Sequence, residues 1–360
     1  MVSVRVVNIT KRYDDVIAVN HVNLEAKDKE LITLLGPSGC GKTTTLRIIA
    51  GLIQPDEGDV YFDDRRVTDL PPYKRNIGFV FQRIALFPHM NVYSNIAFGL
   101  KMRKYPKSEI KKRVKEVLKL VRMEGFEERM PSQLSGGQAQ RVEIARVLAT
   151  DPDVLLFDEP LSNLDAKLRD ELKYEIRRIQ RETGKTAIYV THDQAEAFAI
   201  SDRIYVMKDG RIQQIGTPLE LYMNPQSDFV ADFIGTSNFL KGKIIDIKKE
   251  NKLVIDLETG HKIESFSIAN IKEYNLSDEV LISIRPEDIE LTKDIRYSNN
   301  LIDGFIEEAT FLGAITRLIV RVNEKTIKVD IYGPERFKYA NMNNTKVNLH
   351  VKRFNIIKRK

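Results

Sequence analysis

The chain has 360 residues, a length that predicts about two or three domains at roughly 100 to 200 residues each. Hydrophobic residues make up 42% and charged residues 30%, which is ordinary for globular proteins and excludes collagen-like and disordered chains. No apolar run approaches the roughly 18 residues that a membrane-spanning helix needs. The formal net charge of +6 permits contact with nucleic acid or an anionic membrane without requiring it. A single cysteine forbids an internal disulfide, so we expect a cytosolic chain.

The first two thirds of the chain alternate apolar runs with helical patterns. We expect the start, MVSVRVVNIT, to be the first strand of a domain, because it lacks the basic flank and cleavage site of a signal peptide. Apolar residues recur every three or four positions after Ser108 and from Leu168 to Ile179, which predicts amphipathic helices. Three runs that are apolar on both faces predict buried strands at 31–35, 154–157 and 187–190. Together these patterns predict an α/β domain with a mainly parallel sheet.

After Gly235 the sequence changes to short β-rich runs separated by turn residues. We therefore predict an N-terminal domain of residues 1–235 and a smaller all-β domain of residues 236–360, with the boundary near Gly235–Ser237. The second domain is expected to be a β-barrel, of which the OB-fold is one common form. Such a barrel must bury several of its aromatic residues. Its clearest strand patterns lie at 253–257, 280–284 and 318–322.

A glycine-rich turn follows the predicted strand at 31–35. Its letters, GPSGCGKT, fit the P-loop pattern G-x-x-x-x-G-K-[ST] between a strand and a helix. The glycines let backbone N–H groups converge on phosphate oxygens, Lys42 reaches the β- and γ-phosphates, and the Thr43 hydroxyl ligates Mg²⁺. The predicted ATP-binding residues here are Gly36, Pro37, Ser38, Gly39, Cys40, Gly41, Lys42, Thr43 and Thr44.

A magnesium-bound triphosphate needs a carboxylate at the end of a neighbouring strand, and VLLFDEP places Asp158 and Glu159 there. We expect Asp158 to orient the metal and its waters. Glu159 then polarises the attacking water as general base, because successive residues beyond a strand point in different directions. Taken alone, such an acid pair is more often a loop with a helix cap. The assignment therefore depends on the other motifs.

A second glycine-rich motif, LSGGQ at 134–138, precedes a pattern that predicts a helix beginning right after the glycines. Backbone and hydroxyl donors at such a helix terminus bind phosphate. We expect this second phosphate-binding motif to contact the γ-phosphate that a partner molecule binds, so that ATP joins a head-to-tail pair with two-fold symmetry. The predicted donors are Ser135, Gly136, Gly137 and Gln138.

With the P-loop, LSGGQ, and LLFDEP followed by SNLD in this order, the sequence resembles the nucleotide-binding subunits of ABC transporters. The resemblance implies that Tyr13 stacks on adenine and that Gln82 senses magnesium and touches the membrane subunit. It implies that Asp165 ends a loop that communicates across the dimer, and that His192 in VTHD holds the γ-phosphate. The implied cofactors are ATP and Mg²⁺, and the implied metal-site residues are Thr43, Gln82 and Asp158.

Each of these residues also has an ordinary interpretation. Tyr13 alone is a typical surface aromatic, Gln82 a solvated loop residue and His192 a histidine at a helix start. The motif context favours the functional interpretation of all three. His192 follows a predicted strand, so its ring is expected at the same sheet edge as Glu159, where ligands of open α/β sheets bind.

Cys40 stands inside the phosphate loop. A thiol at a helix N-terminus can have a lowered pKa and act as a redox switch. The alternative is a small side chain tolerated where the backbone does the binding, and we favour that alternative.

The resemblance extends to the ATPases of binding-protein-dependent importers, through ALFPHMNVYSNIAFGL at 85–100, ADFIGTSNFLKGKI at 231–244 and IRPEDIE at 284–290. It implies a helical subdomain at about 86–150 and a C-terminal transport-associated OB-like domain used for dimer contact and regulation. The implied partners are a second copy, two integral membrane permease subunits and, indirectly, an extracytoplasmic solute-binding protein. The chain would then act peripherally at the cytoplasmic face of the cell membrane.

Solute specificity is only weakly indicated. Several stretches resemble the spermidine/putrescine-type branch more than the maltose-type branch, so the expected solute is a polyamine, then a sugar, then ferric iron. Arg83 and Ile84 depart from the family, which has a small polar residue and an aromatic after the glutamine. We therefore do not carry over the family's usual contact with the membrane subunit at these two positions, whereas the expectation of ATP hydrolysis is unchanged.

Two other classes remain open. A soluble P-loop ATPase could act on nucleic acid through the C-terminal barrel. However, translation factors of this superfamily carry two P-loops in one chain and chromosome-associated ATPases insert long heptads, and neither feature is present, so no nucleic-acid partner is expected. The C-terminal domain could also bind a regulator or a small effector, which is compatible with the importer interpretation.

Overall fold

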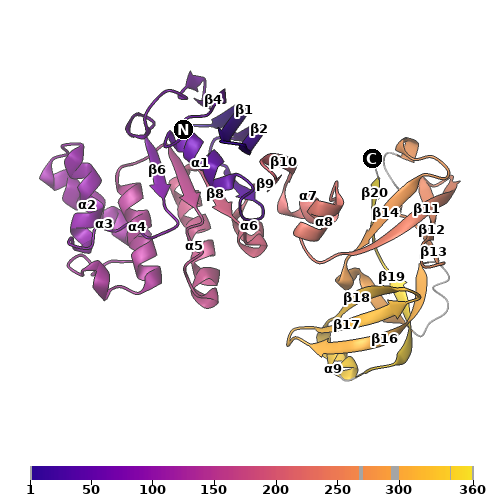
Figure 1. Cartoon of the computed structure of the whole chain (residues 1–360). Coiled ribbons are helices and arrows are strands. Elements are labelled where there is room, and N and C mark those ends of the chain that lie inside the picture. Colours follow the sequence, from indigo (N-terminus) through magenta and orange to yellow (C-terminus); the bar gives the residue numbers. More distant parts are fainter. Residues whose placement is uncertain (1, 267–270, 293–299, 341, 359–360) are drawn as a thin grey trace. The chain divides into compact units, whose positions relative to one another are not determined.

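The computed structural model describes residues 2–266, 271–292, 300–340 and 342–358. The chain divides into two compact units, residues 1–218 and 219–360 (Figure 1). Among the described residues, no helix combines the length and the apolar character needed to cross a membrane.

The boundary between the units lies before the predicted one near Gly235. Residues 219–235, which include helix α8 (Asp228–Phe233), group with the second unit. The reason is Arg285, which donates from Nη1 to the carbonyl oxygens of Ala231 at 2.6 Å and Gly235 at 2.8 Å. Its guanidinium also lies 4.6 Å from the ring centroid of Tyr222. Because Arg285 is far along the chain, local sequence patterns could not reveal this attachment.

The first unit is built on a six-stranded sheet in the order β10-β9-β3-β8-β7-β6. All neighbours in it pair in parallel except β10 and β9. The three strands predicted from apolar runs are present as β3, β7 and β8. The strands are β3 (Leu31–Leu35), β6 (Ile77–Val80), β7 (Val154–Asp158), β8 (Thr186–Thr191), β9 (Arg203–Lys208) and β10 (Arg211–Gly216).

The sheet is buried on both faces, which explains why its central strands are apolar throughout. On one face, Leu155, Phe157 and Tyr189 join the core beneath α2 (Val92–Met102), α3 (Lys107–Leu120), α4 (Gly136–Ala149) and α5 (Ala166–Thr183). On the other face, Leu156 and Ile188 join a core with α1 (Lys42–Ala50). Alternate residues of each strand thus belong to different cores, as strand geometry requires.

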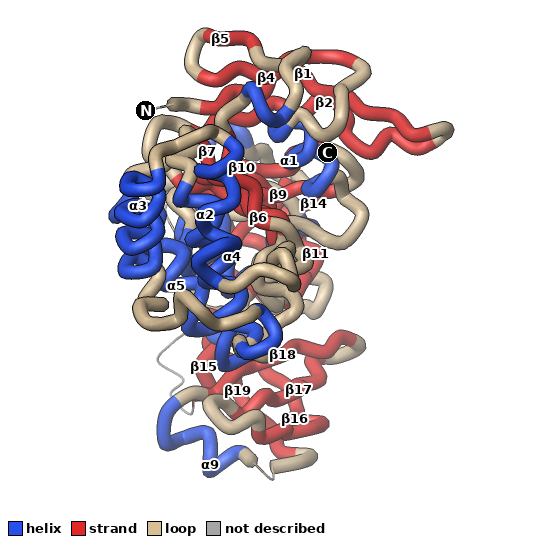
Figure 2. Tube along the Cα trace, turned by 90° about the vertical axis from the view of Figure 1, so that its left-hand side faces the viewer, coloured by secondary structure: helices blue, strands red, loops and turns tan. Residues whose placement is uncertain are grey.

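A second, antiparallel sheet in the order β2-β1-β4-β5 covers the α1 face. Figures 1 and 2 show α2, α3 and α4 standing together, apart from β1 and β2. Helices α2 to α4 occupy the region predicted as a helical subdomain, but they share one continuous core with α5 and the parallel sheet. The strands of the second sheet are β1 (Val4–Tyr13), β2 (Val16–Ala26), β4 (Glu57–Phe62) and β5 (Arg65–Arg66).

In its described residues, the second unit holds two antiparallel five-stranded sheets around a single hydrophobic core. One sheet has the order β13-β12-β11-β14-β20 and the other β15-β19-β16-β17-β18. The strands are β11 (Asn238–Lys248), β12 (Lys252–Leu257), β13 (Lys262–Glu264), β14 (Glu279–Ile284), β15 (Ile289–Thr292), β16 (Leu301–Phe311), β17 (Thr316–Val322), β18 (Lys325–Ile331), β19 (Thr345–Val351) and β20 (Asn355–Lys358). The helices of this part are α7 (Pro218–Met223), α8 and α9 (Arg336–Tyr339).

Few aromatic residues contribute to the core of this unit: Phe354 is buried, and Tyr274 and Tyr339 are partly buried and pack against it. Among the described aromatics beyond Gly235, only Phe354 is buried, and Tyr297 lies outside the described residues. Aliphatic side chains fill the core instead, so the unit does not need aromatic residues inside. The exposed aromatics are Phe266, Phe305, Phe311, Tyr332 and Phe337.

A buried arginine binds backbone carbonyls at the C-terminal end of α1. Arg75 is only 2% exposed and donates to the carbonyl oxygens of Ile48, Ile49, Leu70 and Thr68 at 2.7 to 2.9 Å. Burial lowers the pKa of Arg75 to about 10. Carbonyls at a helix C-terminus lack intrahelical donors, so the guanidinium supplies a donor to Ile49 and a second donor to Ile48, which also accepts from the Gly51 N–H at 3.0 Å.

We expect Arg75→Met to lower the free energy of unfolding by about 3 kcal/mol, because four carbonyls lose the hydrogen bond from Arg75 while the apolar stem is kept. Urea denaturation followed by far-UV circular dichroism measures the change. The matched control is Arg65→Met at an exposed position of β5. Equal stabilities of the two variants would contradict this account.

Candidate nucleotide site

The predicted site residues converge because four parallel strands end at one sheet edge. Leu35 of β3 pairs with Thr191 of β8, and Asp158 of β7 pairs with Val190. The P-loop, His192 and Glu159 therefore leave the sheet at neighbouring positions. The sequence analysis expected the carboxylates at the end of a strand next to the P-loop strand. In the structure, β8 lies between the P-loop strand β3 and the carboxylate strand β7.

The P-loop has the backbone that its glycines predict. Gly39 has φ +79° and Gly41, which precedes α1, has φ +98°, a region that side chains with a Cβ rarely adopt. Lys42 is 4% exposed, and its Nζ donates to the carbonyl oxygens of Gly36 at 2.8 Å and Pro37 at 2.9 Å. The ammonium is thus held inside the loop that the motif assigns to phosphate.

Cys40 is buried, with 3% of its surface exposed. Burial raises the pKa of its thiol, and the nearby Lys42 ammonium, whose Nζ is 3.9 Å from Sγ, opposes this rise. The structure therefore supports the interpretation of Cys40 as a small packed side chain rather than a reactive thiolate.

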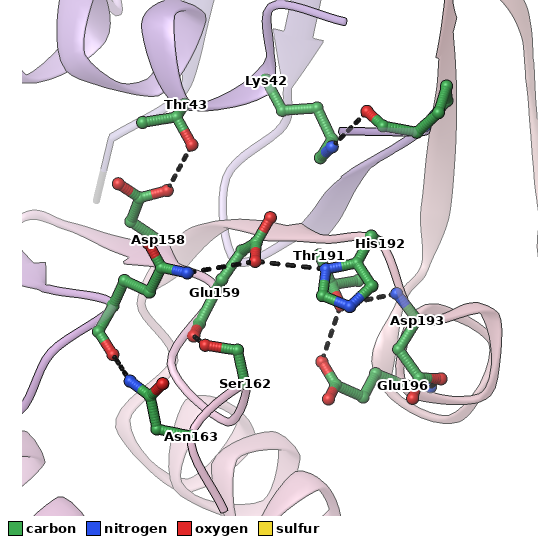
Figure 3. Close-up of polar contacts among 12 residues, drawn as sticks. Lys42, Thr43, Asp158, Glu159, Ser162, Asn163, Thr191, His192, Asp193 and Glu196 are labelled. Carbon is green, nitrogen blue, oxygen red and sulfur yellow. Dashed lines mark hydrogen bonds and ion pairs between the residues drawn. The ribbon is translucent and has the colours of Figure 1, made fainter. Parts of the chain in front are cut away.

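Thr43 and Asp158 form the candidate magnesium site. The Thr43 hydroxyl donates to Asp158 Oδ1 at 2.8 Å (Figure 3). Arg47 Nη2 is 3.7 Å from Asp158 Oδ2. Burial raises the pKa of Asp158. Two hard oxygen donors in contact fit Mg²⁺, which is typically held by one or two protein groups together with phosphates. The described residues include no cluster of three or more metal-ligating His, Cys, Asp or Glu side chains.

Glu159 points away from Asp158, as the sequence analysis predicted. Its φ of +44° is in the left-handed region, which turns the chain sharply as β7 ends. The backbone N–H of Glu159 donates to the carbonyl of Val190 at 3.0 Å and holds this turn against β8. In Figure 3 the carboxylate lies between Asp158 and His192. A strained backbone conformation of this kind is typical of functional sites.

His192 and Gln82 both contact the Glu159 carboxylate. His192 Nδ1 is 3.1 Å from Glu159 Oε2, and Gln82 Nε2 donates to the same oxygen at 3.5 Å. The His192 side chain is 52% exposed and that of Glu159 is 16% exposed. The side-chain hydrogen bond of Gln82 is thus made to Glu159 and not to Thr43 or Asp158.

Two residues that the sequence analysis did not single out hold the backbone of Gln82 and Glu159 through hydrogen bonds. Asn163 donates from Nδ2 to the carbonyl of Gln82 at 2.7 Å, and Ser162 donates from Oγ to the carbonyl of Glu159 at 2.9 Å. Both residues lie in the SNLD motif, which is the sequence signal that could have identified them. Asp165, at the end of this motif, caps α5 by accepting from the Leu168 N–H at 3.0 Å.

The LSGGQ motif lies at the start of α4, which begins at Gly136 and not after the glycines as predicted. Ser135 is the N-cap, and it forms a capping box with Gln138, which starts the helix early. A Cβ on Gly137 would come within 2.6 Å of Leu168, so this glycine allows α4 to pack closely on α5. No hydrogen bond or ion pair joins residues 135–138 to residues 36–44 of the same chain, all of which the structure describes.

Tyr13 lies at the end of β1. It is 45% exposed, and its ring centroid is 5.6 Å from Lys11 Nζ. An exposed ring is available for stacking.

The comparisons with known proteins agree with this geometry. The ABC transporter family model matches residues 19–162, and the TOBE domain model matches residues 282–341. The Fe(3+) ions import ATP-binding protein FbpC of Fusobacterium nucleatum is 47% identical over 92% of this chain and 86% of its own. The spermidine/putrescine import ATP-binding protein PotA of Clostridium novyi is 45% identical over 89% of each chain. The chain belongs to the ABC importer ATP-binding proteins.

Solved structures support the same fold. The structure of cbiO1 from Clostridium perfringens, part of the ABC transporter complex cbiONQ, has a TM-score of 0.57 and 33% identity and covers 61% of this chain and 90% of its own. The dimeric bacterial ABC transporter cassette MJ0796 has a TM-score of 0.53 and 38% identity and covers 59% of this chain and 98% of its own. The predicted P-loop ATPase domain followed by an all-β domain is confirmed, and the protein is an ATPase. The nucleic-acid alternative receives no support from these matches.

A buried acid follows the signature motif on the same helix. Glu143 of α4 is fully buried and accepts from the Ala85 N–H at 3.2 Å, while Arg146 Nη2 is 3.8 Å from the same oxygen, Oε1. Its other oxygen has no hydrogen-bond partner among the described residues. Burial raises the pKa of Glu143 to about 7, despite the opposing effects of the Ala85 N–H and Arg146.

This shift makes stability depend on pH. Because the folded-state pKa is raised, the stability linked to Glu143 is fully present below about pH 4.5 and is lost as pH rises through about 7. We expect Glu143→Gln to become more stable relative to wild type between pH 5 and pH 8, by about 3 kcal/mol at most. Urea denaturation at both pH values measures the difference. The exposed Glu171→Gln is the control, and a pH-independent difference for Glu143→Gln would contradict the shift.

Proposed function

We propose that this chain hydrolyses Mg²⁺-ATP as an ATP-bridged homodimer and thereby drives polyamine import through two separate membrane permease subunits. The observation that carries the proposal is the Glu159 carboxylate held between His192 and Gln82, at the sheet edge where the P-loop also lies. This arrangement supports a general-base role for Glu159 beside the groups expected to hold the terminal phosphate.

In the proposed mechanism, the backbone N–H groups of the P-loop and Lys42 bind the β- and γ-phosphates. Glu159 accepts the proton of a water molecule as it attacks the γ-phosphorus, and ADP leaves. His192 donates a hydrogen bond to the γ-phosphate from the position it occupies beside Glu159. Bound Mg²⁺, held by Thr43 and Asp158, would neutralise developing charge on the phosphates.

The homodimer follows from where the signature motif lies. Ser135 and Gly136 are exposed at the start of α4 and make no contact with the P-loop of their own chain. A helix N-terminus with exposed donors is an anion site, and the γ-phosphate of a second copy is the anion that a head-to-tail pair would bring to it. In that pair the loop ending at Asp165 would lie near the shared nucleotide, since Gly136 packs close to Leu164.

The importer context supplies the remaining partners. The permease subunits would hold the chain peripherally at the cytoplasmic face of the membrane, and a solute-binding protein outside the cytoplasm would deliver the solute. The second unit would contribute dimer contacts or regulation. Polyamine is the favoured solute because relatives named as spermidine/putrescine import proteins, including one from Thermotoga maritima at 46% identity, cover most of this chain. Ferric iron is the second candidate on the same grounds.

Reconstituted transport tests this proposal. We expect proteoliposomes containing this chain, the permease pair and the binding protein from the same gene cluster to take up radiolabelled spermidine or putrescine when ATP is enclosed. Ferric iron and maltose should neither be taken up nor compete. Uptake of iron or maltose in place of polyamine would overturn the solute assignment.

The matched control is Lys42→Ala, which removes the only predicted side-chain cation at the β- and γ-phosphates. This variant should abolish uptake and weaken ATP binding at least about tenfold. Unchanged ATP affinity in a binding titration would contradict the role of the P-loop lysine.

A further inference from the structure

A buried acid lies directly behind the histidine turn. Glu196 of α6 (Gln194–Ile200) is 4% exposed, and its Oε2 accepts two hydroxyl hydrogen bonds, from Tyr189 at 2.9 Å and from Thr191 at 2.8 Å. A carboxylate oxygen has the lone pairs to accept both. Desolvation is the main cause that raises the pKa of Glu196, and the two hydroxyl hydrogen bonds oppose it.

These hydrogen bonds fix the backbone on both sides of His192. The Thr191 hydroxyl donates to Glu196 and also accepts from the Asp193 N–H at 2.9 Å. The Asp193 side chain in turn accepts from the Glu196 N–H at 3.1 Å and caps α6. Residues 191 and 193 are thus tied to one another and to α6, while the imidazole between them faces Glu159 (Figure 3).

The same cluster reaches the loop that precedes α5. Arg169 Nη1 is 3.6 Å from Asp193 Oδ2, and its Nε is 3.8 Å from Glu196 Oε1. Its Nη2 donates to the carbonyl of Leu164 at 3.0 Å, one residue before Asp165. The guanidinium therefore offsets the buried negative charge and joins the histidine turn to the SNLD loop.

We propose that Glu196, acting through the Thr191 hydroxyl, is a positioning residue that holds the His192 imidazole within reach of Glu159 and the γ-phosphate. The inference rests on the role of His192 in the proposed function. The imidazole is half exposed and its contact with Glu159 is its single side-chain hydrogen bond among the described residues, so the turn beneath must supply its orientation. A displacement of about 1 Å in a catalytic group can cost on the order of a hundredfold in rate.

The test breaks the tether while keeping side-chain shape. In the purified full-length protein, Thr191→Val should lower kcat for ATP hydrolysis by roughly 10- to 100-fold and change KM by less than about twofold. Thr191→Ser restores the hydroxyl and should recover most of the rate. The control is Thr68→Val, which removes another buried threonine hydroxyl far from this turn and should leave kcat unchanged.

A double-mutant cycle separates positioning from a merely structural role. If Glu196 and Thr191 act through His192, adding Thr191→Val to His192→Ala should lower kcat by less than about twofold further. A full additional loss, or no rescue by serine, would overturn the proposal. A low kcat in His192→Ala beside a normal kcat in Thr191→Val would overturn it while leaving the role of His192 intact. A normal kcat in His192→Ala would contradict the proposed function and the positioning role together.

Discussion

The pairing of parallel strands at one sheet edge is the constraint on which the rest of the site depends. Because β3, β8, β7 and β6 are hydrogen-bonded in fixed register, the residues that follow them must emerge side by side. This register brings together groups from segments far apart in the sequence, namely the P-loop, His192, Glu159 and Gln82. The two hydrophobic cores on either face of the sheet hold that register by burying every residue of β3, β7 and β8.

On this edge one chain brings together the residues proposed to act in catalysis. The left-handed backbone at Glu159 separates its carboxylate from the buried Asp158, as the proposal requires if Asp158 is to hold the metal and Glu159 the water. Glu196 orders the histidine turn from behind. The signature motif, in contrast, is anchored on α5 through Gly137 and Leu168. One chain therefore presents two incomplete halves of a phosphate site, and a second copy can complete both.

The sequence was most informative where a local rule decides the structure. Strands apolar on both faces, a P-loop between a strand and a helix, and amphipathic periods in α3 and α5 were all predicted, because each depends on neighbouring residues. Features that depend on contacts between residues far apart in the sequence were not predicted. Arg285 attaches residues 219–235 to the second unit, β8 lies between β3 and β7, and aliphatic side chains form most of the core of the second unit. Glu196 was missed since its partners become apparent only once β8 and α6 are folded.

The central claim is that two copies of this chain complete one another's ATP sites. Size-exclusion chromatography with light scattering on Glu159→Gln, which binds ATP but lacks the proposed base, tests it most directly. The account predicts a monomer without nucleotide, a dimer with saturating ATP, and a return to monomer when Ser135→Arg is added. A variant that binds ATP but stays monomeric, or a dimer indifferent to both ATP and Ser135, would contradict it.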